Sequence, residues 1–366
     1  MRDGDRADGR SHRAVAGWAL AGTAVAFALF LLDVRASGAG ILRPIQAGAD
    51  GPSAAVIRHD FPEASLPDGV GLDGQQFYAL ARDPWHPGQV APYLGAARYR
   101  YQRPLFPVVA WLLHPSGGGP GLVCALVVVN LFGLFGSGLA LGAISPRLRG
   151  PPWLAGLYPL LPGAMWSLFD GVADGLAVAL SLATIALFLD GRTRLACCAA
   201  VAAVLARETT ILVPLALVLS TRRRADLPLV VAPALALAAV FMAVVAFVPA
   251  GGTAPEGLVA PFNGLVDAVR RRWLHGEELI GMASTLGAFV LGGWVLAARR
   301  GPVALRWVVG LQMAFLAVCS GDVLGNDFGG TRSTLMLLAV AVVVLVAAAR
   351  GGYPDRASTG ARNWPV

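Results

Sequence analysis

The chain has 366 residues, of which 56% are hydrophobic and 14% charged, and its mean hydropathy is +0.63. Soluble domains carry about 25% charged residues, so this composition excludes a soluble globular domain and indicates an integral membrane protein. All 29 basic residues are Arg, and the net charge is +7. Arg beside apolar helices orients membrane proteins, so we expect membrane lipids as partners and no nucleic acid.

Apolar runs of bilayer-spanning length recur from one end of the chain to the other. About 17–25 apolar residues cross the hydrocarbon core, and lipid cannot satisfy backbone hydrogen bonds, so such runs must be helical. The long runs are 14–32, 121–144, 227–249, 279–298 and 333–349. Shorter apolar runs, which include half-helices, are 153–169, 172–189, 195–206, 209–219 and 303–319.

The positions of the arginines predict the orientation. Arg2, Arg6, Arg10 and Arg13 precede the first run, which places the N-terminus in the cytoplasm. Segment 33–103 is then the first outer loop. It is long, polar and rich in Pro, Gly and aromatic residues, and we expect short helices in it that lie at the membrane interface.

The apolar run 105–113 allows two topologies. If it spans the membrane, Arg147 and Arg149 lie outside; if it lies flat at the outer interface, they lie inside with most other Arg clusters. Nine residues are too few to span, so we prefer the second. Its cost is that Arg270–Arg272 stay outside, in a second large outer loop at 250–278.

We therefore predict an all-α, polytopic transmembrane helix bundle of about ten helices, some of them short. A long first extracytoplasmic loop bears interfacial helices. The transmembrane domain covers residues 1–350, and 351–366 form a cytoplasmic tail. On this topology the unusual polar residues gather on the outer side, and charges at a membrane edge are candidates for function.

Asp73 opens the first polar group. Glycines flank it, and we expect a short amphipathic helix from Gln75 to Arg82 with Phe77 and Tyr78 at the interface. A carboxylate held at the membrane edge suits a general base or a metal ligand. The alternative is that Asp73 only caps that helix by accepting from backbone N–H groups.

The second group is the run around Arg100 and Arg103, which stands among the aromatics Tyr99 and Tyr101 just before the flat run. Arginine binds phosphate oxygens with a planar fork. These two side chains therefore suit a lipid phosphate or pyrophosphate. The alternative is that they are interface anchors whose charged ends reach water.

Further polar groups enter the later apolar runs. Asp170 and Asp174 are four residues apart and would share a helix face, although Asp170 by itself would also suit a cap. Arg207 and Glu208 stand between two short runs, either as a mutual ion pair or as ligand-binding groups. Arg332 leads into the last run and would face the same cavity. The scattered His and Cys residues give no metal-binding spacing.

The order of these segments resembles the GT-C superfamily of membrane glycosyltransferases. The resemblance lies in a first span, an outer loop with Asp-Gly-Gln-x-Phe-Tyr at 73–78 and Tyr-Arg-Tyr-x-Arg at 99–103, and many later spans. The matching blocks are 72–82, 98–111, 168–182 and 205–214. The chain looks closest to a group of bacterial proteins that form cell-surface glycopolymers, distantly similar to the GPI mannosyltransferases.

The resemblance implies sugar transfer from a polyprenyl-phosphate donor to a glycan or lipid acceptor at the outer face of a bacterial plasma membrane. Asp73 matches the catalytic base, or a ligand of a divalent metal ion. Many members carry a second acid there, but Gly74 and Gln75 follow Asp73 here, so metal dependence stays open. The substrate-binding candidates are Gln75, Tyr78, Arg100, Arg103, Asp170, Asp174, Arg207, Glu208 and Arg332.

Two other classes of function compete with the enzyme. The first is a transporter or flippase of lipid-linked glycans, which predicts charges deep in the bundle and often an internal repeat. The second is a non-catalytic membrane subunit of a polysaccharide assembly complex, for which Asp73 would be dispensable. The predicted gathering of charges at one membrane edge favours the glycosyltransferase.

Overall fold

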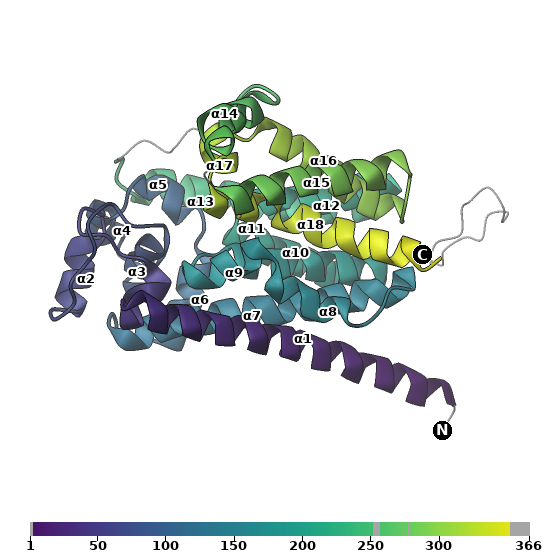
Figure 1. Cartoon of the computed structure of the whole chain (residues 1–366), viewed down its shortest axis with the longest axis horizontal. Helices are drawn as coiled ribbons and strands as arrows, with labels where there is room; N and C mark the ends of the chain where they lie inside the picture. The colour runs from purple at the N-terminus through teal and green to yellow at the C-terminus, as the bar shows by residue number, and fades with distance from the viewer. Residues whose placement is uncertain (1–2, 252–256, 277, 352–366) are drawn as a thin grey trace.

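The computed structural model describes residues 3–251, 257–276 and 278–351, and this part of the chain is all-helical (Figure 1). In it no β-strand forms, and the only β-type pairing is a single bridge between Leu258 and Cys319. The all-α fold class is therefore confirmed. The tail predicted at 351–366 lies, apart from its first residue, outside the described residues.

Five helices are long and apolar enough to cross a membrane, which supports a multi-pass membrane protein. Four further apolar helices are shorter, and the count of about ten helices stays a prediction. The long helices are α1 (Asp3–Ser37), α7 (Pro120–Ile144), α13 (Pro228–Phe247), α15 (Leu279–Ala297) and α18 (Asp327–Ala349). The shorter ones are α10 (Asp174–Leu189), α11 (Thr193–Ala206), α12 (Leu212–Thr221) and α16 (Val303–Val318).

These helices run along the long axis of the molecule (Figure 1). The elements of the first loop cover one end, and α1 begins and α18 finishes at the other. The loop elements are η1 (Gly40–Ile45), α2 (Ala54–Asp60), α3 (Gly74–Arg82), α4 (Pro87–Val90), η2 (Ala91–Tyr93) and α5 (Ala97–Tyr101).

Helix α3 is buried, which corrects the expectation of an interfacial helix there. Phe77 and Tyr78 are 2% and 0% exposed, and every residue from Gly74 to Ala81 is buried. The helix packs against α7 and against α6 (Leu105–Leu113), whose nine residues rise only about 14 Å. The first loop therefore packs around an apolar core that it shares with α6, the first half of α7 and the end of α13.

Small residues bring the central helices close together, as is common in membrane bundles. A Cβ on Gly133 of α7 would lie 2.8 Å from the backbone of Gly175 in α10. A Cβ on Gly163 of α9 (Pro162–Phe169) would lie 2.3 Å from the carbonyl oxygen of Thr331 in α18. These contacts fix the α9–α10 turn beside the start of α18, where the candidate site lies.

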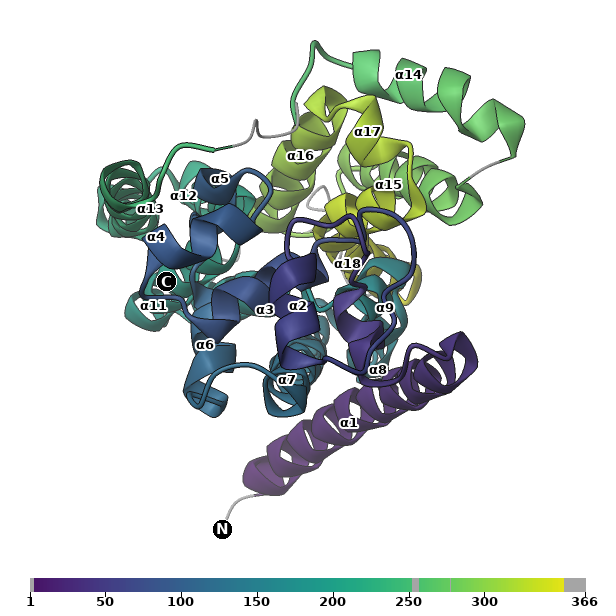
Figure 2. The same ribbon diagram turned by 90° about the vertical axis from the view of Figure 1, so that its left-hand side faces the viewer.

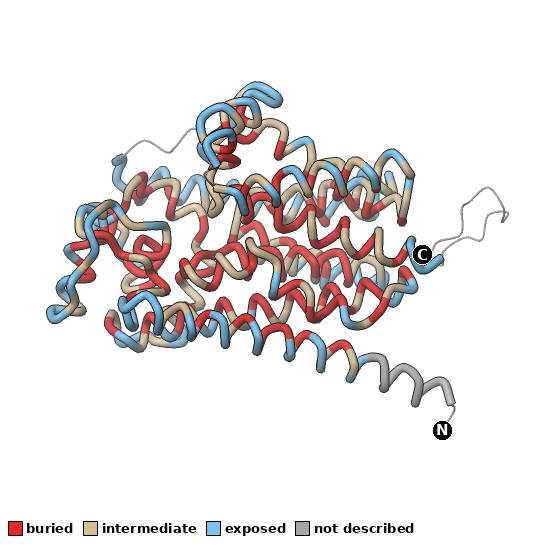
Figure 3. Tube along the Cα trace, in the orientation of Figure 1, coloured by how far each residue is buried: buried red, intermediate tan, exposed pale blue. Residues whose placement is uncertain are grey.

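Burial separates the central helices from the peripheral ones (Figure 3). Most of α7 and α18 is buried, whereas α13 buries only 17% of its apolar stretch and so offers a broad face to lipid. Short elements complete the chain: η3 (Ser145–Leu148), α8 (Leu154–Leu157), η4 (Tyr158–Leu160), η5 (Glu208–Ile211), η6 (Arg224–Asp226), α14 (Asn263–Arg271), η7 (Trp273–His275) and α17 (Gly321–Leu324).

Candidate functional site

Charged residues from distant parts of the chain meet where the first loop rests on the bundle. They are the four acids and the four arginines that the sequence singled out, and ion pairs link them. Their side chains are buried or mostly buried, so these charges exist there only because they pair with one another. The set is Asp73, Asp170, Asp174, Glu208, Arg100, Arg103, Arg207 and Arg332.

Asp73 lies at the N-cap position of α3, but its carboxylate does not cap the helix. Its Oδ1 accepts from Nη2 of Arg100 at 2.7 Å, and its Oδ2 accepts from Nη2 of Arg332 at 3.4 Å. The capping alternative is therefore wrong. The side chain keeps 24% of its surface exposed, so the carboxylate reaches the surface while two guanidinium groups hold it.

The two arginines also set the protonation state of Asp73. Burial by itself raises the pKa of this carboxyl, but the charges of Arg332 and Arg100 and the hydrogen bond from Arg100 outweigh it. The pKa therefore lies well below the ordinary carboxyl range. Asp73 is ionised at neutral pH, and it is a weak base as long as both arginines stay in contact with it.

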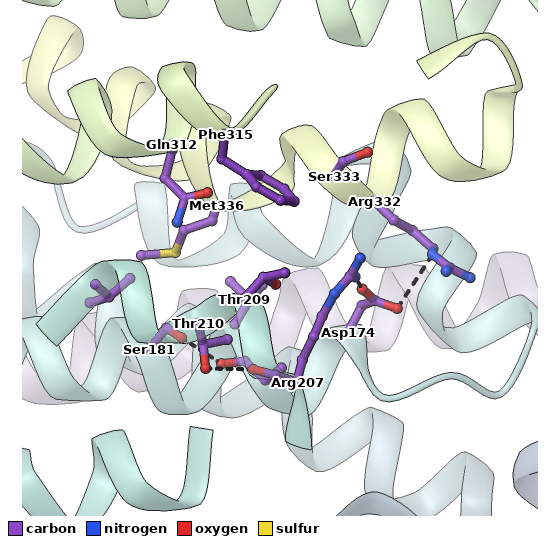
Figure 4. Close-up of a pocket in the computed structure, with 13 residues that line it drawn as sticks. Asp174, Ser181, Arg207, Thr209, Thr210, Gln312, Phe315, Arg332, Ser333 and Met336 are labelled. Atoms are coloured by element: carbon purple, nitrogen blue, oxygen red, sulfur yellow. Dashed lines mark hydrogen bonds and ion pairs between the residues drawn. The ribbon is translucent and has the colours of Figure 1, made fainter. Parts of the chain in front are cut away.

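Arg332 joins the loop to the bundle. Its guanidinium contacts Asp73 at 3.4 Å, Asp170 at 3.5 Å and Asp174 at 3.3 Å, and it lies over the ring of Phe328 with 4.1 Å between the guanidinium carbon and the ring centroid. One cation thus serves three carboxylates from two segments, the first loop and the α9–α10 turn. Figure 4 shows it beside Asp174 among the residues that line a small cavity.

Asp170 is fully buried and holds the start of α3 in place. Its Oδ1 accepts from the backbone N–H of Gly74 at 3.3 Å. A Cβ on Gly74 would lie 2.0 Å from the carbonyl oxygen of Asp170, so this approach requires glycine. The capping alternative for Asp170 is wrong, because Ala173 is the N-cap residue of α10 and no side chain caps that helix.

Arg103 and Glu208 form a second, bidentate pair. Nε and Nη2 of Arg103 donate to the two carboxylate oxygens of Glu208 at 2.8 and 2.6 Å, and the hydroxyl of Tyr99 accepts from Nη2 at 2.5 Å. Arg207 pairs instead with Asp174. The alternative of a mutual Arg207–Glu208 pair is therefore wrong, since each residue pairs with a partner on another segment.

Gln75 and Tyr78 lie outside this cluster, within the loop. Nε2 of Gln75 donates to the carbonyl oxygens of Val70 at 2.6 Å and Leu72 at 3.1 Å. The Tyr78 hydroxyl donates to Asp60 at 2.7 Å and accepts from the N–H of Gly119 at 2.6 Å. The hydrogen bonds of Gln75 lie within the first loop, and those of Tyr78 join it to Asp60 and to Gly119 just before α7. Neither side chain contacts the ion pairs.

A cavity of about 30 Å³ continues from the ion pairs into the bundle, which is room for about two water molecules. Asp174, Arg207 and Arg332 line its outer end, and Gln312 and Phe315 line it from α16 (Figure 4). The sequence reading missed the last two. The signal for Gln312 was present, since it is a polar residue inside an apolar helix.

The described residues do not fit a divalent metal ion. No three His, Cys, Asp or Glu side chains among them gather as a ligand set, and Mg²⁺ or Ca²⁺ needs several oxygen ligands. Arg100 and Arg332 surround Asp73 with positive charge instead. The groups that the described site offers for chemistry are therefore its carboxylate and guanidinium side chains.

Comparison with known proteins gave no relative: no protein-family model, curated protein or solved structure matches the chain. The arrangement offers guanidinium groups to an anion and a partly exposed carboxylate beside them, at the end of an apolar bundle.

Proposed function

We propose that this protein is a membrane glycosyltransferase that moves a sugar from a polyprenyl-phosphate donor to a glycan or lipid acceptor at the outer face of a bacterial plasma membrane. One observation carries the proposal. A partly exposed carboxylate, Asp73, lies between two guanidinium groups, Arg100 and Arg332, at the end of the bundle that faces outward on the predicted topology. These are the groups that deprotonating a hydroxyl and holding a leaving phosphate require.

The reaction is an inverting displacement at the anomeric carbon of the donor. The acceptor oxygen forms the new bond to that carbon, and its proton goes to the carboxylate of Asp73. The bond between the carbon and the phosphate oxygen breaks, and its electron pair stays on the phosphate. Arg100 and Arg332 stabilise the charge that grows there.

Binding of the donor would raise the pKa of Asp73 and so make it a stronger base. In the structure Arg100 and Arg332 hold Asp73, which lowers its pKa. A donor phosphate competes for the same guanidinium groups. Once they pair with phosphate, Asp73 loses the interactions that favoured its charged form, and its pKa rises toward the ordinary value. The carboxylate therefore becomes a stronger base only when a donor is bound.

The lipid tail of the donor has a suitable surface nearby. Helix α13 is apolar and mostly exposed, and its last turn is tied to the site region because Nε of Arg98 donates to the carbonyl oxygen of Val248 at 3.1 Å. A polyprenyl chain that lies along α13 would bring its phosphate to the level of α5. Substrate would then enter from the membrane, without a nucleotide site.

Transfer by the purified protein, given polyprenyl-phosphate sugars and labelled acceptors, tests the proposal. Asp73→Asn should abolish transfer, because the amide cannot take the proton. It should also bind polyprenyl phosphate more tightly than the wild type, because Arg100 and Arg332 no longer have an anionic competitor at that position. Asp83→Asn is the matched control, since Asp83 lies in the same loop and pairs with His86 outside the site, and it should keep both properties.

The outcomes separate the three classes of function. Transfer that survives in Asp73→Asn would exclude Asp73 as the base but keep the transferase, whereas a wild type that binds polyprenyl phosphate without transfer would leave a binding protein. A flippase would move lipid-linked glycan across vesicle membranes without forming a new glycosidic bond. A non-catalytic subunit would do neither, and Asp73→Asn would leave its assembly unchanged.

A further inference from the structure

A cavity of about 340 Å³ lies outside the candidate site, between α14 and the segment from Ser320 to Asp322 at the start of α17. Figures 1 and 2 show α14 and α17 beside each other at the rim of the molecule. Helix α18 begins just after α17 and carries Arg332 in its first two turns, so the cavity lies at the same end of the bundle as the candidate site. Its volume falls within the range of about 300–1,000 Å³ that is usual for small-molecule sites.

One face of α14 forms the first wall of this rim cavity. Asn263, Asp267 and Arg271 are spaced four residues apart, so they follow one another on the same side of the helix, and all three line the cavity. Nε of Arg271 contacts Oδ1 of Asp267 at 2.6 Å. This contact uses one of the five N–H donors of the guanidinium, and the others remain for a ligand. The wall therefore offers an amide, a carboxylate and a guanidinium in a row.

The opposite wall contains a buried hydroxyl group that lacks a partner. Ser320 lines the cavity and is only 5% exposed, yet its Oγ has no hydrogen-bond partner among the described residues, and it does not cap α17. A buried polar group in this state is costly and rare, so it indicates that a ligand supplies the missing hydrogen bond. The exposed carboxylate of Asp322 lines the cavity beside it.

Two glycines let these walls come together. A Cβ on Gly264 would lie 1.9 Å from the carbonyl oxygen of Cys319, and a Cβ on Gly321 would lie 2.2 Å from Oδ2 of Asp267. Neither position has room for a side chain. The spacing of α14 and α17, and with it the position of the polar groups, is therefore fixed by close backbone packing.

The polar groups of the described lining favour one class of ligand. Two carboxylates, Asp267 and Asp322, face one guanidinium, that of Arg271, so the excess of negative charge disfavours a phosphate. No three His, Cys, Asp or Glu side chains gather as a metal-ligand set in the described part of the chain. A lipid tail would leave the polar groups without partners. A neutral ligand with several hydroxyl groups fits, because each hydroxyl can donate to a carboxylate and accept from an amide or a guanidinium.

We propose that the rim cavity binds one sugar unit of a glycan, whose hydroxyl groups form hydrogen bonds with Asn263, Ser320 and Asp322. Binding of the sugar depends only on the cavity. That the bound glycan is the acceptor of transfer rests on the proposed function. A glycan held at the rim contacts neither Asp73 nor the donor phosphate through this unit, so the cavity contributes to acceptor affinity and not to the chemical step.

Saturation-transfer NMR of the full-length protein in nanodiscs tests the binding. The probes are disaccharides of glucose, galactose, mannose and N-acetylglucosamine, and at least one should bind the wild type. Asp322→Ala should weaken that binding about tenfold, the effect of losing one hydrogen bond to a charged group. Asp68→Ala, which removes an exposed acid of the first loop, is the matched control and should bind like the wild type. The proposal is overturned if no disaccharide binds, or if Asp322→Ala binds as tightly as the wild type.

Two further measurements separate a ligand site from a structural feature and from a cation site. Ser320→Ala should weaken disaccharide binding without lowering the melting temperature, because it removes a hydroxyl that no described residue pairs with; a lower melting temperature with unchanged binding would assign Ser320 to the fold and overturn its role. Calcium chloride without sugar should leave the melting temperatures of the wild type and Asp322→Ala equally unchanged. Stabilisation of the wild type alone would show a cation site and overturn the sugar proposal.

Transfer kinetics distinguish a failure of this proposal from a failure of the proposed function. Asp322→Ala should raise the KM for the acceptor about tenfold and leave kcat and the KM for the donor as in the wild type. An active Asp322→Ala with an unchanged acceptor KM would overturn the acceptor role of the cavity and keep the transferase. A wild type that binds the disaccharide through Asp322 but transfers no sugar would overturn the proposed function and keep the cavity as a glycan site.

Discussion

Two groups of arginines at the same end of the molecule lie in opposite environments. In the candidate site, the side chains of Arg103 and Arg332 are 7% and 9% exposed and contact carboxylates from other segments. On α14, Arg271 is 70% exposed and pairs only within its own helix. Arginines buried beside acids form a preorganised site, in which an anionic ligand must compete with the carboxylates for the guanidinium groups. Exposed arginines suit the weaker and less specific attraction of a membrane surface.

The largest difference is expected from removing one arginine of each kind. Arg332→Gln leaves Asp73, Asp170 and Asp174 without their shared cation, and breaking a buried pair in this way costs about 3–5 kcal/mol. Arg270→Gln changes an exposed residue, for which we expect a change within about 0.5 kcal/mol. Reversible unfolding in mixed detergent would measure both free energies of unfolding. Similar values would mean that the ion-pair cluster does not hold the loop on the bundle.

The acid partners repeat the comparison with a smaller effect. Glu208→Gln leaves the buried guanidinium of Arg103 without its bidentate partner, and since Glu208 is itself 24% exposed we expect a loss of about 3 kcal/mol. Asp267→Asn breaks the exposed pair with Arg271 and should cost less than about 1 kcal/mol. The same unfolding measurement distinguishes them, and an equal cost would contradict the assigned difference in burial.

Two glycines test how closely the loop must approach the bundle. Gly74→Ala places a methyl group 2.0 Å from the carbonyl oxygen of Asp170, so the start of α3 must shift, at about 1–3 kcal/mol. The shift also moves Asp73, and transfer should fall. Gly88→Ala in α4 meets nothing within 4 Å and should change neither stability nor transfer. Unimpaired transfer in Gly74→Ala would show that Asp73 need not hold this position.

The smallest expected effect is a displacement between two pH profiles. The pKa of Asp73 is lowered in the free protein, so the acid limb of kcat/KM should lie below the ordinary carboxyl value of about 3.9. The limb of kcat reports the donor complex, in which phosphate holds the arginines, and should lie at higher pH. If the acid limbs of kcat/KM and kcat fell at the same pH, Arg100 and Arg332 would not leave Asp73 for the donor phosphate.

The same pKa fixes the pH dependence of stability. Because the folded-state value is below the unfolded one, the contribution of Asp73 to stability is complete above about pH 3.9 and is lost as the pH falls through the folded-state pKa. Between pH 7 and about pH 4, the free energy of unfolding of the wild type should therefore change with pH in the same way as that of Asp73→Asn. If the wild type lost stability in this range and Asp73→Asn did not, the arginines would not hold the carboxylate.

The sequence predicted the acids and arginines of the cluster but not how they pair. Asp73 and Arg332 are 259 positions apart, and no local pattern indicates which of several acids a buried guanidinium will contact. Local reasoning offered caps for Asp73 and Asp170 and a mutual pair for Arg207 and Glu208 as alternatives, because those partners are near in sequence. The structure excludes these alternatives, since a charge removed from water must find the partner that the fold brings to it.

Helix α3 shows the same limit for apolar residues. Its amphipathic pattern predicted a helix at about the correct residues, but a pattern of this kind is the same for a helix in a membrane interface and for one on a protein core. The packing of α6 and α7 on both sides buried Phe77 and Tyr78. Gln75 and Tyr78 then contacted the loop instead of the site.

The sequence by itself determined that the protein is a helical membrane protein and which polar residues are costly enough to matter. Both follow from local length and composition, because a lipid solvent demands long apolar helices and penalises each charge separately. Only the tertiary structure decided that the loop shares an apolar core with the bundle, that Arg332 serves three acids and that α14 stands at the rim. Those facts depend on which distant segments come into contact, and that is a property of the packed chain as a whole.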